Sequence, residues 1–219
     1  MVKARAMRIH ENGGPEVLTF EDVEIASPES GKVLIKQHAI GLNFIDTYIR
    51  SGLYPAKLPT IPGFEGAGVV EEVGEDVTHL KPGDRVAYSS LNGTYATHVV
   101  GATDSVVKIP ESVTFEEAAA LMLKGMTAWM LLFEIKRVMP GDKVLVWAAA
   151  GGVGTLLVRW AKALGAEVFG VVSTEEKARR VLDNGADHVV LSSDDVAATV
   201  RELTGGKGVD ISLDGVGKD

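Results

Sequence analysis

A glycine-rich turn is the part of this sequence whose residue types point most directly to a chemistry. The letters AAGGVG at positions 149–154 follow a short apolar run and precede residues with helical spacing. A strand that enters such a turn and leaves as a helix presents backbone N–H groups and the positive helix end to an anion, with no Cβ atoms in the way. The alternative is that the glycines only allow close packing of helix on strand, because the first position of the G-x-G-x-x-G pattern is Ala149. The residues that we expect to contact a dinucleotide pyrophosphate are Ala150, Gly151, Gly152 and Val153.

The residues after the next apolar run indicate which dinucleotide would bind. A site for NAD usually places a carboxylate about 20 residues past the glycine turn, whereas the residue 19 positions beyond Gly154 (173 minus 154) is Ser173. Nothing there repels a 2′-phosphate and Lys177 lies one helical turn further on, so we predict NADPH as the cofactor. Two alternatives stay open. Ser173 caps a helix with Glu176 in a capping box, and Glu175 or Glu176 serves a ribose hydroxyl of NADH.

The segments around this turn alternate between strand and helix patterns. Short apolar runs predict strands at 143–148, 167–172, 188–191 and 209–213. Helical spacing predicts helices at 153–164, 174–184 and 194–204, and Gly165 ends the first of them. Strands that alternate with helices predict a doubly wound parallel sheet, so this half of the chain belongs to the α/β class.

The N-terminal half is predicted to be mostly β, because turn residues separate its short apolar runs. The expected strands are 17–25, 32–41, 66–73, 84–89, 95–100 and 105–109, with a short helix at 43–51. This spacing suggests a compact barrel or sandwich. Helix formers then dominate 114–123 and 125–138. We place the domain boundary between these two helices, which gives domains at 1–124 and 125–219.

Composition excludes several other classes of protein and site. The chain has 219 residues and a formal net charge of -8, so it lacks the basic surface that nucleic acid or an anionic membrane would need. No apolar run of about 18 residues and no signal-peptide pattern are visible, which predicts a cytoplasmic protein with no membrane partner. With no cysteine, the chain has no disulfide, no thiol nucleophile and no zinc site that uses sulfur.

Five segments together resemble the medium-chain dehydrogenase/reductase superfamily, and more closely its zinc-free, zeta-crystallin-like quinone oxidoreductase branch. They are GGPEVL at 13–18, GLNFIDTY through RSGLYP at 41–55, PGFEGAGVV at 62–70, LKGMTA at 123–128 and AAAGGVG at 148–154. The resemblance implies a GroES-like catalytic domain followed by a Rossmann domain whose strands have the order 3-2-1-4. It also implies an active site between the two domains.

The resemblance further implies chemistry without a metal. Zinc-dependent members of the superfamily hold their metal with Cys and His, but here Asn43 stands where the first cysteine would fall and Phe64 replaces the histidine of their Gly-His-Glu motif. Without a Lewis acid, alcohol oxidation becomes difficult, whereas a quinone accepts hydride unaided. The expected reaction is therefore NADPH-dependent reduction of a quinone or of a similar conjugated carbonyl such as an enone.

The family pattern also suggests which residues of the N-terminal half take part. It places Asn43, Tyr48 and Thr127 near the nicotinamide and Tyr54 near the substrate, and we expect Asp46 of the same motif at the cofactor. Tyr48 or Tyr54 would donate a hydrogen bond to the quinone oxygen as charge develops there. The alternative for each tyrosine is ordinary aromatic packing with a satisfied hydroxyl.

Two departures from the family pattern keep other functions open. Relatives carry a tyrosine after the third strand that helps to hold the 2′-phosphate, where this chain has Leu191-Ser192-Ser193. The sequence also stops after its fourth predicted strand, whereas a Rossmann sheet normally has six, so we expect a C-terminally truncated form. A nucleotide-binding module without catalysis is the alternative, and the region of a possible homodimer contact would be missing. An uncovered fourth strand would expose a sheet edge.

Overall fold

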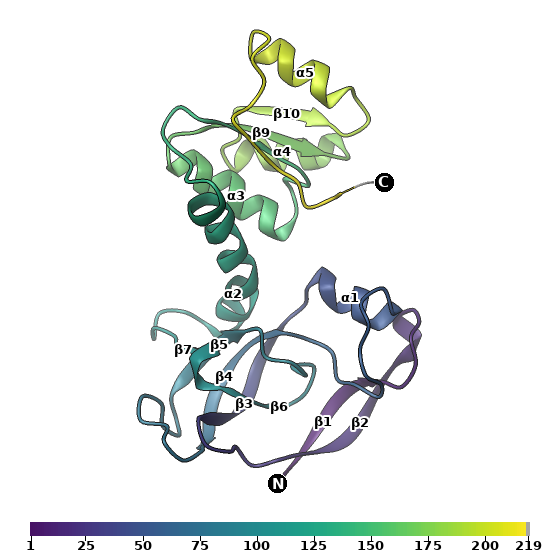
Figure 1. Ribbon diagram of the computed structural model, residues 1–219, viewed down its shortest axis with the longest axis vertical. Coiled ribbons are helices and arrows are strands. Elements are labelled where there is room, and N and C mark those ends of the chain that lie inside the picture. Colours follow the sequence, from purple (N-terminus) through teal and green to yellow (C-terminus); the bar gives the residue numbers. More distant parts are fainter. Residues whose placement is uncertain (218–219) are drawn as a thin grey trace. The chain divides into compact units, whose positions relative to one another are not determined.

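The computed structural model describes residues 1–217 and consists of two compact units. The N-terminal unit is Met1–Leu123 and the C-terminal unit is Lys124–Asp219. Figure 1 labels the helices and strands of both units. Each unit has hydrophobic clusters of its own.

The N-terminal unit is built from two antiparallel sheets. A two-stranded sheet pairs β1 (Val2–Ile9) with β2 (Leu18–Ile25). A five-stranded sheet has the order β6-β3-β4-β5-β7. Its strands are β3 (Lys32–Gly41), β4 (Glu65–Val73), β5 (Arg85–Ser89), β6 (His98–Ala102) and β7 (Val106–Lys108). The mostly β character expected of this half is confirmed, together with its GroES-like class.

Alternating side chains of the five-stranded sheet form the core of this unit. Val33, Ile35, Val86 and Tyr88 are all 0% exposed and pack into one cluster with Val99. Alternation of this kind places every second side chain on the same face of a strand. The connection from β3 to β4 contains α1 (Phe44–Ser51), which ends at Gly52 in the left-handed conformation (φ 85°). The packed sheet thus supports α1 and the segment before it, which follow directly after β3.

A long helix follows β7 and corrects one of our predictions. The sequence suggested two helices at 114–123 and 125–138, but α2 (Phe115–Trp129) runs through Gly125 without a break and continues as a π-helical segment, Met130–Ile135. Packing outweighs the low helix propensity of glycine here, because Ala118 and Ala119 join one cluster and Leu132 another. The division between the units falls inside this helix.

The helical stretch Phe115–Ile135 is also the most apolar helix among residues 1–217. By length and composition alone it is apolar enough to cross a membrane, and 22% of its 18-residue window is buried. Core helices of soluble proteins pass the same test of length and composition.

The first turn of α2 is capped reciprocally, because the Thr114 N–H donates to Glu117 Oε2 (2.9 Å) and the Glu117 N–H donates to Thr114 Oγ1 (3.1 Å).

The C-terminal unit contains the parallel sheet that the sequence predicted. Its strand order is β10-β9-β8-β11, and all three pairings are parallel. The strands are β8 (Lys143–Val146), β9 (Glu167–Val172), β10 (His188–Leu191) and β11 (Ile211–Leu213). In chain order this is 3-2-1-4, so the doubly wound α/β prediction is confirmed.

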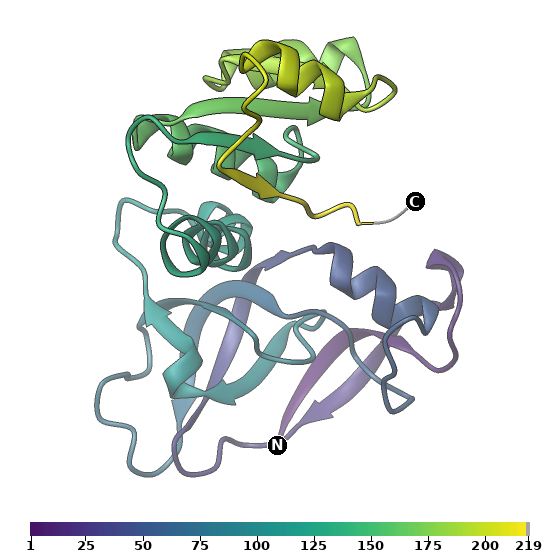
Figure 2. The ribbon, with the colours of Figure 1, turned by 45° about the horizontal axis from the view of Figure 1, so that its top comes forward.

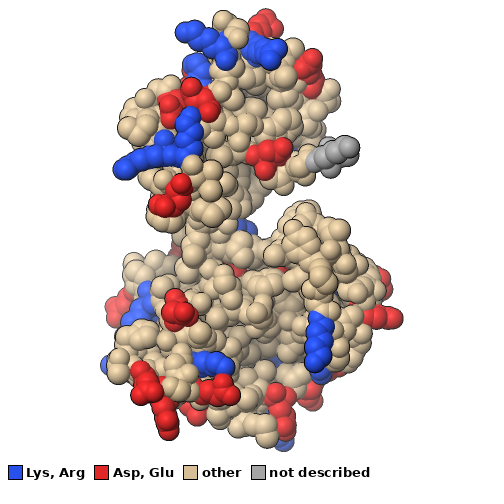
Figure 3. Space-filling view, viewed as in Figure 1, with Lys and Arg blue, Asp and Glu red and all other residues tan. Residues whose placement is uncertain are grey.

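Helices cover both faces of this sheet (Figure 2). The helices are α3 (Gly152–Ala163), α4 (Glu175–Asp183) and α5 (Val196–Leu203). Leu157 and Val158 of α3 and Val181 of α4 share one cluster with Val144 and Val146 of β8, whereas α5 packs into a second cluster on the other side. On the face drawn in Figure 3, basic and acidic side chains are interspersed over both units.

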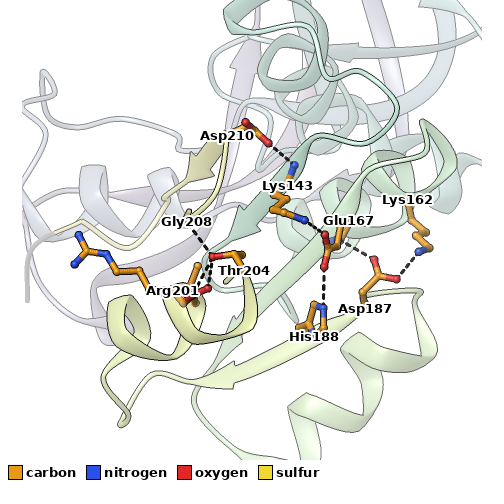
Figure 4. A network of polar contacts seen from close by, with 11 residues as sticks. Lys143, Lys162, Glu167, Asp187, His188, Arg201, Thr204, Gly208 and Asp210 are labelled. Carbon is orange, nitrogen blue, oxygen red and sulfur yellow. Dashed lines mark hydrogen bonds and ion pairs between the residues drawn. The ribbon is translucent and has the colours of Figure 1, made fainter. Parts of the chain in front are cut away.

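Charged side chains connect the amino ends of three neighbouring strands (Figure 4). The ammonium group of Lys143 pairs with Glu167 Oε2, and Glu167 Oε1 lies 3.0 Å from His188 Nε2. Next to them, Lys162 Nζ lies 2.5 Å from Asp187 Oδ1. Lys143, Glu167 and His188 are the first residues of β8, β9 and β10. This network therefore links the amino ends of the three strands, and the glycine turn lies at their opposite, carboxyl ends.

Several predicted boundaries differ from those in the structure. The strand β1 was not among the predicted strands, and the strand expected at 95–100 begins only at His98. A 3-10 turn, Thr103–Ser105, replaces the start of the last strand of the N-terminal half. The strand expected at 143–148 is shortened to β8, because the backbone turns after Val146 to form the glycine loop, and the strand expected at 209–213 begins only at Ile211.

Candidate functional site

The glycine turn lies between β8 and α3, where parallel strands end and a helix begins. Residues 147–150 form a turn, Gly151 precedes the helix in an extended conformation (φ -75°, ψ 176°), and α3 starts at Gly152. The turn is closed by the Gly151 N–H, which donates to the Ala148 carbonyl at 2.8 Å. Ala148 takes a left-handed conformation (φ 48°), which is unusual for a residue with a Cβ atom. The backbone thus turns sharply between the end of β8 and the first turn of α3.

Two glycines permit the close packing that this turn requires. A Cβ atom on Gly154 would collide with the Ala148 carbonyl and would lie 2.8 Å from the Ala149 Cα atom. A Cβ atom on Gly170 in β9 would lie 2.6 Å from Val181 Cγ1 and 3.1 Å from Ala149 Cβ. These contacts hold α3 and α4 against the sheet. Gly154 and Gly170 do not line the outward side of the turn. Close packing and anion binding therefore depend on different glycines.

A pocket of about 420 Å³ opens beside this turn, at the carboxyl ends of β8 and β9. Its lining is Trp147, Ala148, Ala150, Gly151, Val171, Val172, Ser173, Lys177, Ser192 and Val216. It therefore brings together four of the predicted cofactor residues, Ala150, Gly151, Ser173 and Lys177. Gly152 and Val153 do not line it, although both lie in the first turn of α3.

The pocket has a cation where a 2′-phosphate was predicted. Lys177 Nζ donates to Ser173 Oγ at 2.8 Å, so the ammonium group and the hydroxyl form one hydrogen-bonding pair. The cap of α4 is Thr174, whose Oγ1 accepts from the Lys177 N–H at 3.3 Å. The alternative in which Ser173 caps this helix is therefore wrong by one residue, and the Ser173 hydroxyl faces the lysine instead.

These residues fit a dinucleotide phosphate. The first turn of α3 contains no acidic residue, so nothing in it opposes an anion at the positive helix end. A Cβ atom on Gly151 would meet only the Ala148 carbonyl, at 3.1 Å, so the outer side of the turn is open. Glu175 and Glu176 begin α4, are exposed, and do not line the pocket.

In the N-terminal unit, hydrogen bonds fix the two polar residues predicted at the start of α1. Asn43 and Asp46 are buried (6% and 4% exposed), and the Asn43 N–H donates to Asp46 Oδ2 at 2.9 Å. The Tyr95 hydroxyl donates to the same oxygen, also at 2.9 Å. Burial and this bond to Asp46 raise the pKa of Tyr95 above its usual value, so the phenol remains a donor at neutral pH.

The two predicted tyrosines lie against each other. The rings of Tyr48 and Tyr54 are 5.4 Å apart between centroids, and the Tyr54 N–H donates to the Tyr48 carbonyl at 3.1 Å. Phe44 extends the row, with its ring 5.7 Å from that of Tyr48. Phe44 is 77% exposed and Tyr54 is 48% exposed, so this row is an accessible aromatic surface on α1 and the loop after it.

Thr127 lies in α2, within the C-terminal unit, and is partly buried. The structure describes Asn43, Asp46, Tyr48 and Tyr54 in one unit and Thr127 with the pocket residues in the other. Across residues 1–217, no group of three His, Asp or Glu side chains could hold a metal ion.

The sequence reasoning missed several residues of these sites. Trp147, Ser192 and Val216 line the pocket, and Tyr95 holds Asp46. Ser192 directly follows the strand predicted at 188–191, a position that indicates a residue at the carboxyl end of the sheet, whereas Trp147 lies inside the strand predicted at 143–148 and follows only the shorter β8. Tyr95 carries no such signal, because its contact with Asp46 joins segments 49 residues apart.

Comparisons with known proteins agree with this geometry. Residues 29–111 match the alcohol dehydrogenase GroES-like domain, and residues 152–219 match the zinc-binding dehydrogenase domain. A quinone oxidoreductase of Pseudomonas aeruginosa is 48% identical over 219 residues, which cover 99% of this chain and 67% of that protein. A 2-haloacrylate reductase of Burkholderia is 45% identical over 96% of this chain and 66% of its own length.

A solved structure shows the same fold with a cofactor bound. The crystal structure of Escherichia coli quinone oxidoreductase complexed with NADPH matches with a TM-score of 0.96 and 43% identity, over 99% of this chain and 67% of that one. The chain thus spans about two thirds of the length of the relatives that it matches.

Proposed function

This chain belongs to the quinone oxidoreductases of the medium-chain dehydrogenase/reductase superfamily, and from that premise we propose that it is an NADPH-dependent quinone oxidoreductase that works without a metal. The observation that carries the proposal is the pocket beside the glycine turn. It combines an open helix end with the Lys177–Ser173 pair. Its relatives are oxidoreductases, and one of them has been solved with NADPH.

In this proposal each part of the pocket binds one part of the cofactor. The N–H groups at Gly152 and Val153, in the first turn of α3, hold the pyrophosphate, and Gly151 leaves the outer side of the turn open to it. Lys177 and Ser173 hold the 2′-phosphate through a charge-assisted hydrogen bond and a hydroxyl. Ala150 leaves room for the backbone to approach the phosphates.

The residues of the N-terminal unit serve the reacting end. NADPH would supply a hydride, which carries two electrons, and solvent would supply one proton, so that a quinone becomes a hydroquinone. Asn43 and Asp46 of this unit bind the nicotinamide end, and Thr127 of α2 in the C-terminal unit is proposed for the same role. The exposed ring of Tyr54 and the half-buried ring of Tyr48 beside it bind a flat acceptor, and a tyrosine hydroxyl donates a hydrogen bond to the acceptor oxygen as its negative charge grows.

Titration of the 219-residue chain with NADPH and with NADH tests this assignment. We expect Lys177→Ala to cost about 1 to 3 kcal/mol in NADPH binding and little in NADH binding. Arg179→Ala is the matched control, since it removes the same charge from a neighbouring position of α4 that does not line the pocket. Equal losses for the two nucleotides would rule out a 2′-phosphate contact.

Steady-state NADPH oxidation separates the two candidate substrate classes. The 45% identity to a 2-haloacrylate reductase favours α,β-unsaturated carbonyls as the second candidate, because both reactions need a conjugated hydride acceptor. Faster turnover of a small quinone than of an enone supports the proposal, and the reverse order supports the second candidate. Nucleotide binding without turnover of either class would indicate a non-catalytic module.

A further inference from the structure

Glu65 is a fully buried carboxylate next to the residues assigned to the nicotinamide end. It begins β4, is 0% exposed, and lies opposite Gly41 in β3 and Ser89 in β5. A Cβ atom on Gly41 would collide with the Glu65 carboxylate and would lie 2.6 Å from the Ala119 carbonyl. Gly41 therefore provides the space that this side chain occupies.

The two oxygens of Glu65 accept hydrogen bonds from two different segments. Oε2 accepts from the Asn43 side-chain amide at 2.8 Å, and Oε1 accepts from the Leu123 backbone N–H at 2.6 Å. Asn43 precedes α1, and Leu123 lies one helical turn before Thr127 in α2. One carboxylate thus holds both segments that carry predicted nicotinamide residues. Hydrogen bonds to an ionised acceptor are about twice as strong as neutral ones.

The bond to Glu65 acts on the side-chain amide N–H of Asn43, whereas Asp46 contacts both the backbone N–H of Asn43 and, in the capping box, its side chain. The Asn43 N–H to Asp46 Oδ2 contact fixes where the residue begins the helix. The Nδ2 to Glu65 contact fixes the rotation of the planar amide, since only an N–H can face a carboxylate oxygen. With one N–H facing Glu65, the directions of the amide oxygen and of the second N–H within the amide plane are set as well.

We propose that Glu65 is a positioning residue that orients the Asn43 amide for the nicotinamide carboxamide of NADPH. This role rests on the proposed function, because it needs a nicotinamide at Asn43. A planar amide recognises a carboxamide through one acceptor and one donor, and both must point the right way. Glu65 sets that direction while it remains buried and away from the cofactor.

Glutamine at position 65 could not accept both of the hydrogen bonds that Glu65 accepts from Asn43 and Leu123. The Asn43 amide and the Leu123 N–H donate to different oxygens of Glu65. Glutamine offers a single oxygen, and its NH₂ group would face an N–H donor on one of the two sides. The side chain would keep its size and lose one bond, which makes Glu65→Gln a change of hydrogen bonding with little change of volume.

The experiment compares two ligands of the whole 219-residue chain. NADPH contains the nicotinamide, and adenosine 2′,5′-bisphosphate contains only the other half of the molecule. We expect Glu65→Gln to weaken NADPH binding about tenfold, or ~1.4 kcal/mol, and to leave the bisphosphate within about twofold. Val99→Ala is the control for lost stability, since Val99 is a core residue of β6 that touches neither site. It should change neither affinity.

Three results would overturn the proposal. They are unchanged NADPH binding by Glu65→Gln, an equal loss for both ligands, and a loss in Val99→Ala that matches the loss in Glu65→Gln. If the unmodified chain binds the bisphosphate and gains nothing from the nicotinamide half, the proposed function itself fails, and the role of Glu65 fails with it.

A second variant covers the case in which Glu65→Gln does not fold. Combining Glu65→Gln with Asn43→Asp exchanges donor and acceptor, so the hydrogen bond between the two side chains can form again. We expect this pair to unfold near the wild-type temperature and still to bind NADPH about tenfold more weakly, because no amide remains at position 43. NADPH binding at wild-type strength would overturn the proposal.

Discussion

At the scale of single residues, the glycine turn separates positions that serve packing from positions that serve a ligand. Gly154 is buried, and a Cβ atom there would meet backbone atoms of Ala148 and Ala149. The atoms nearest to a Cβ atom on Gly152 would belong to the Lys124 side chain, with Cδ at 2.9 Å and Cε at 3.0 Å. A side chain can rotate away, whereas the backbone of the turn cannot do so without opening it.

We therefore expect Gly154→Ala and Gly152→Ala to have different effects on stability. The first should lower the free energy of unfolding by about 1 to 3 kcal/mol, as other overpacked sites do. The second should stay within about 0.5 kcal/mol of the unmodified chain. Urea unfolding followed by tryptophan fluorescence measures both, since Trp129, Trp147 and Trp160 all lie in the C-terminal unit. Similar losses in the two variants would contradict the assignment of the clash to the backbone.

Which contacts a residue makes was the hardest thing to predict from sequence. The glycine turn, Ser173 and Lys177 were found because they lie on one short stretch whose pattern has a known geometry. The contact between Asn43 and Glu65 joins positions 22 residues apart and depends on the antiparallel register of β3 and β4. Nothing in the local sequence specifies that register.

At the scale of elements, the parallel sheet was predictable because its strands are short apolar runs separated by helices of clear period. The strand β1 was not, because its buried positions are Ala4, Ala6 and Ile9, and alanine gives weak hydrophobic alternation. The continuity of α2 through Gly125 was also missed. Propensity predicted a break there, and packing on both sides of the glycine prevents it.

The amino ends of β8, β9 and β10 provide an element-scale prediction about pH. The hydrogen bond from Lys143 holds the pKa of Glu167 below its usual value of 4.5, and His188 contributes in the same direction. A carboxylate with a lowered pKa stabilises the fold above its unfolded pKa, and this contribution is lost as pH falls through the folded pKa. We expect Glu167→Gln to lower the free energy of unfolding by about 0.5 to 1 kcal/mol at pH 7.

Urea unfolding at several pH values checks this expectation. The difference between Glu167→Gln and the unmodified chain should shrink once the pH falls below 4.5, where the unfolded carboxyl is protonated. Glu202→Gln, at an exposed position of α5, is the control and should have little effect at any pH. A difference that stays constant down to acid pH would show that the ionised form of Glu167 is not what stabilises the strand ends.

At the scale of the whole molecule, the two units provide separate cores joined through one helix. Tyr88 and Val33 are central to one core, and Val144 and Val158 to the other, with α2 as the element that spans the division. The adenosine half of the cofactor is assigned entirely to the C-terminal unit. Its binding should therefore stabilise that unit alone, whereas the nicotinamide half is assigned residues in both.

Hydrogen exchange with adenosine 2′,5′-bisphosphate tests this division. At 100 times its dissociation constant, a ligand that binds only the folded form adds about 2.7 kcal/mol, which slows exchange through global opening roughly a hundredfold. We expect this slowing in the most protected amides of β8 and α3 and no change in those of β3 and β4. NADPH in place of the bisphosphate should extend the slowing to the N-terminal unit, because Asn43 and Asp46 are assigned to its nicotinamide end. Equal slowing of both units by the bisphosphate would mean that α2 couples them into a single unfolding unit.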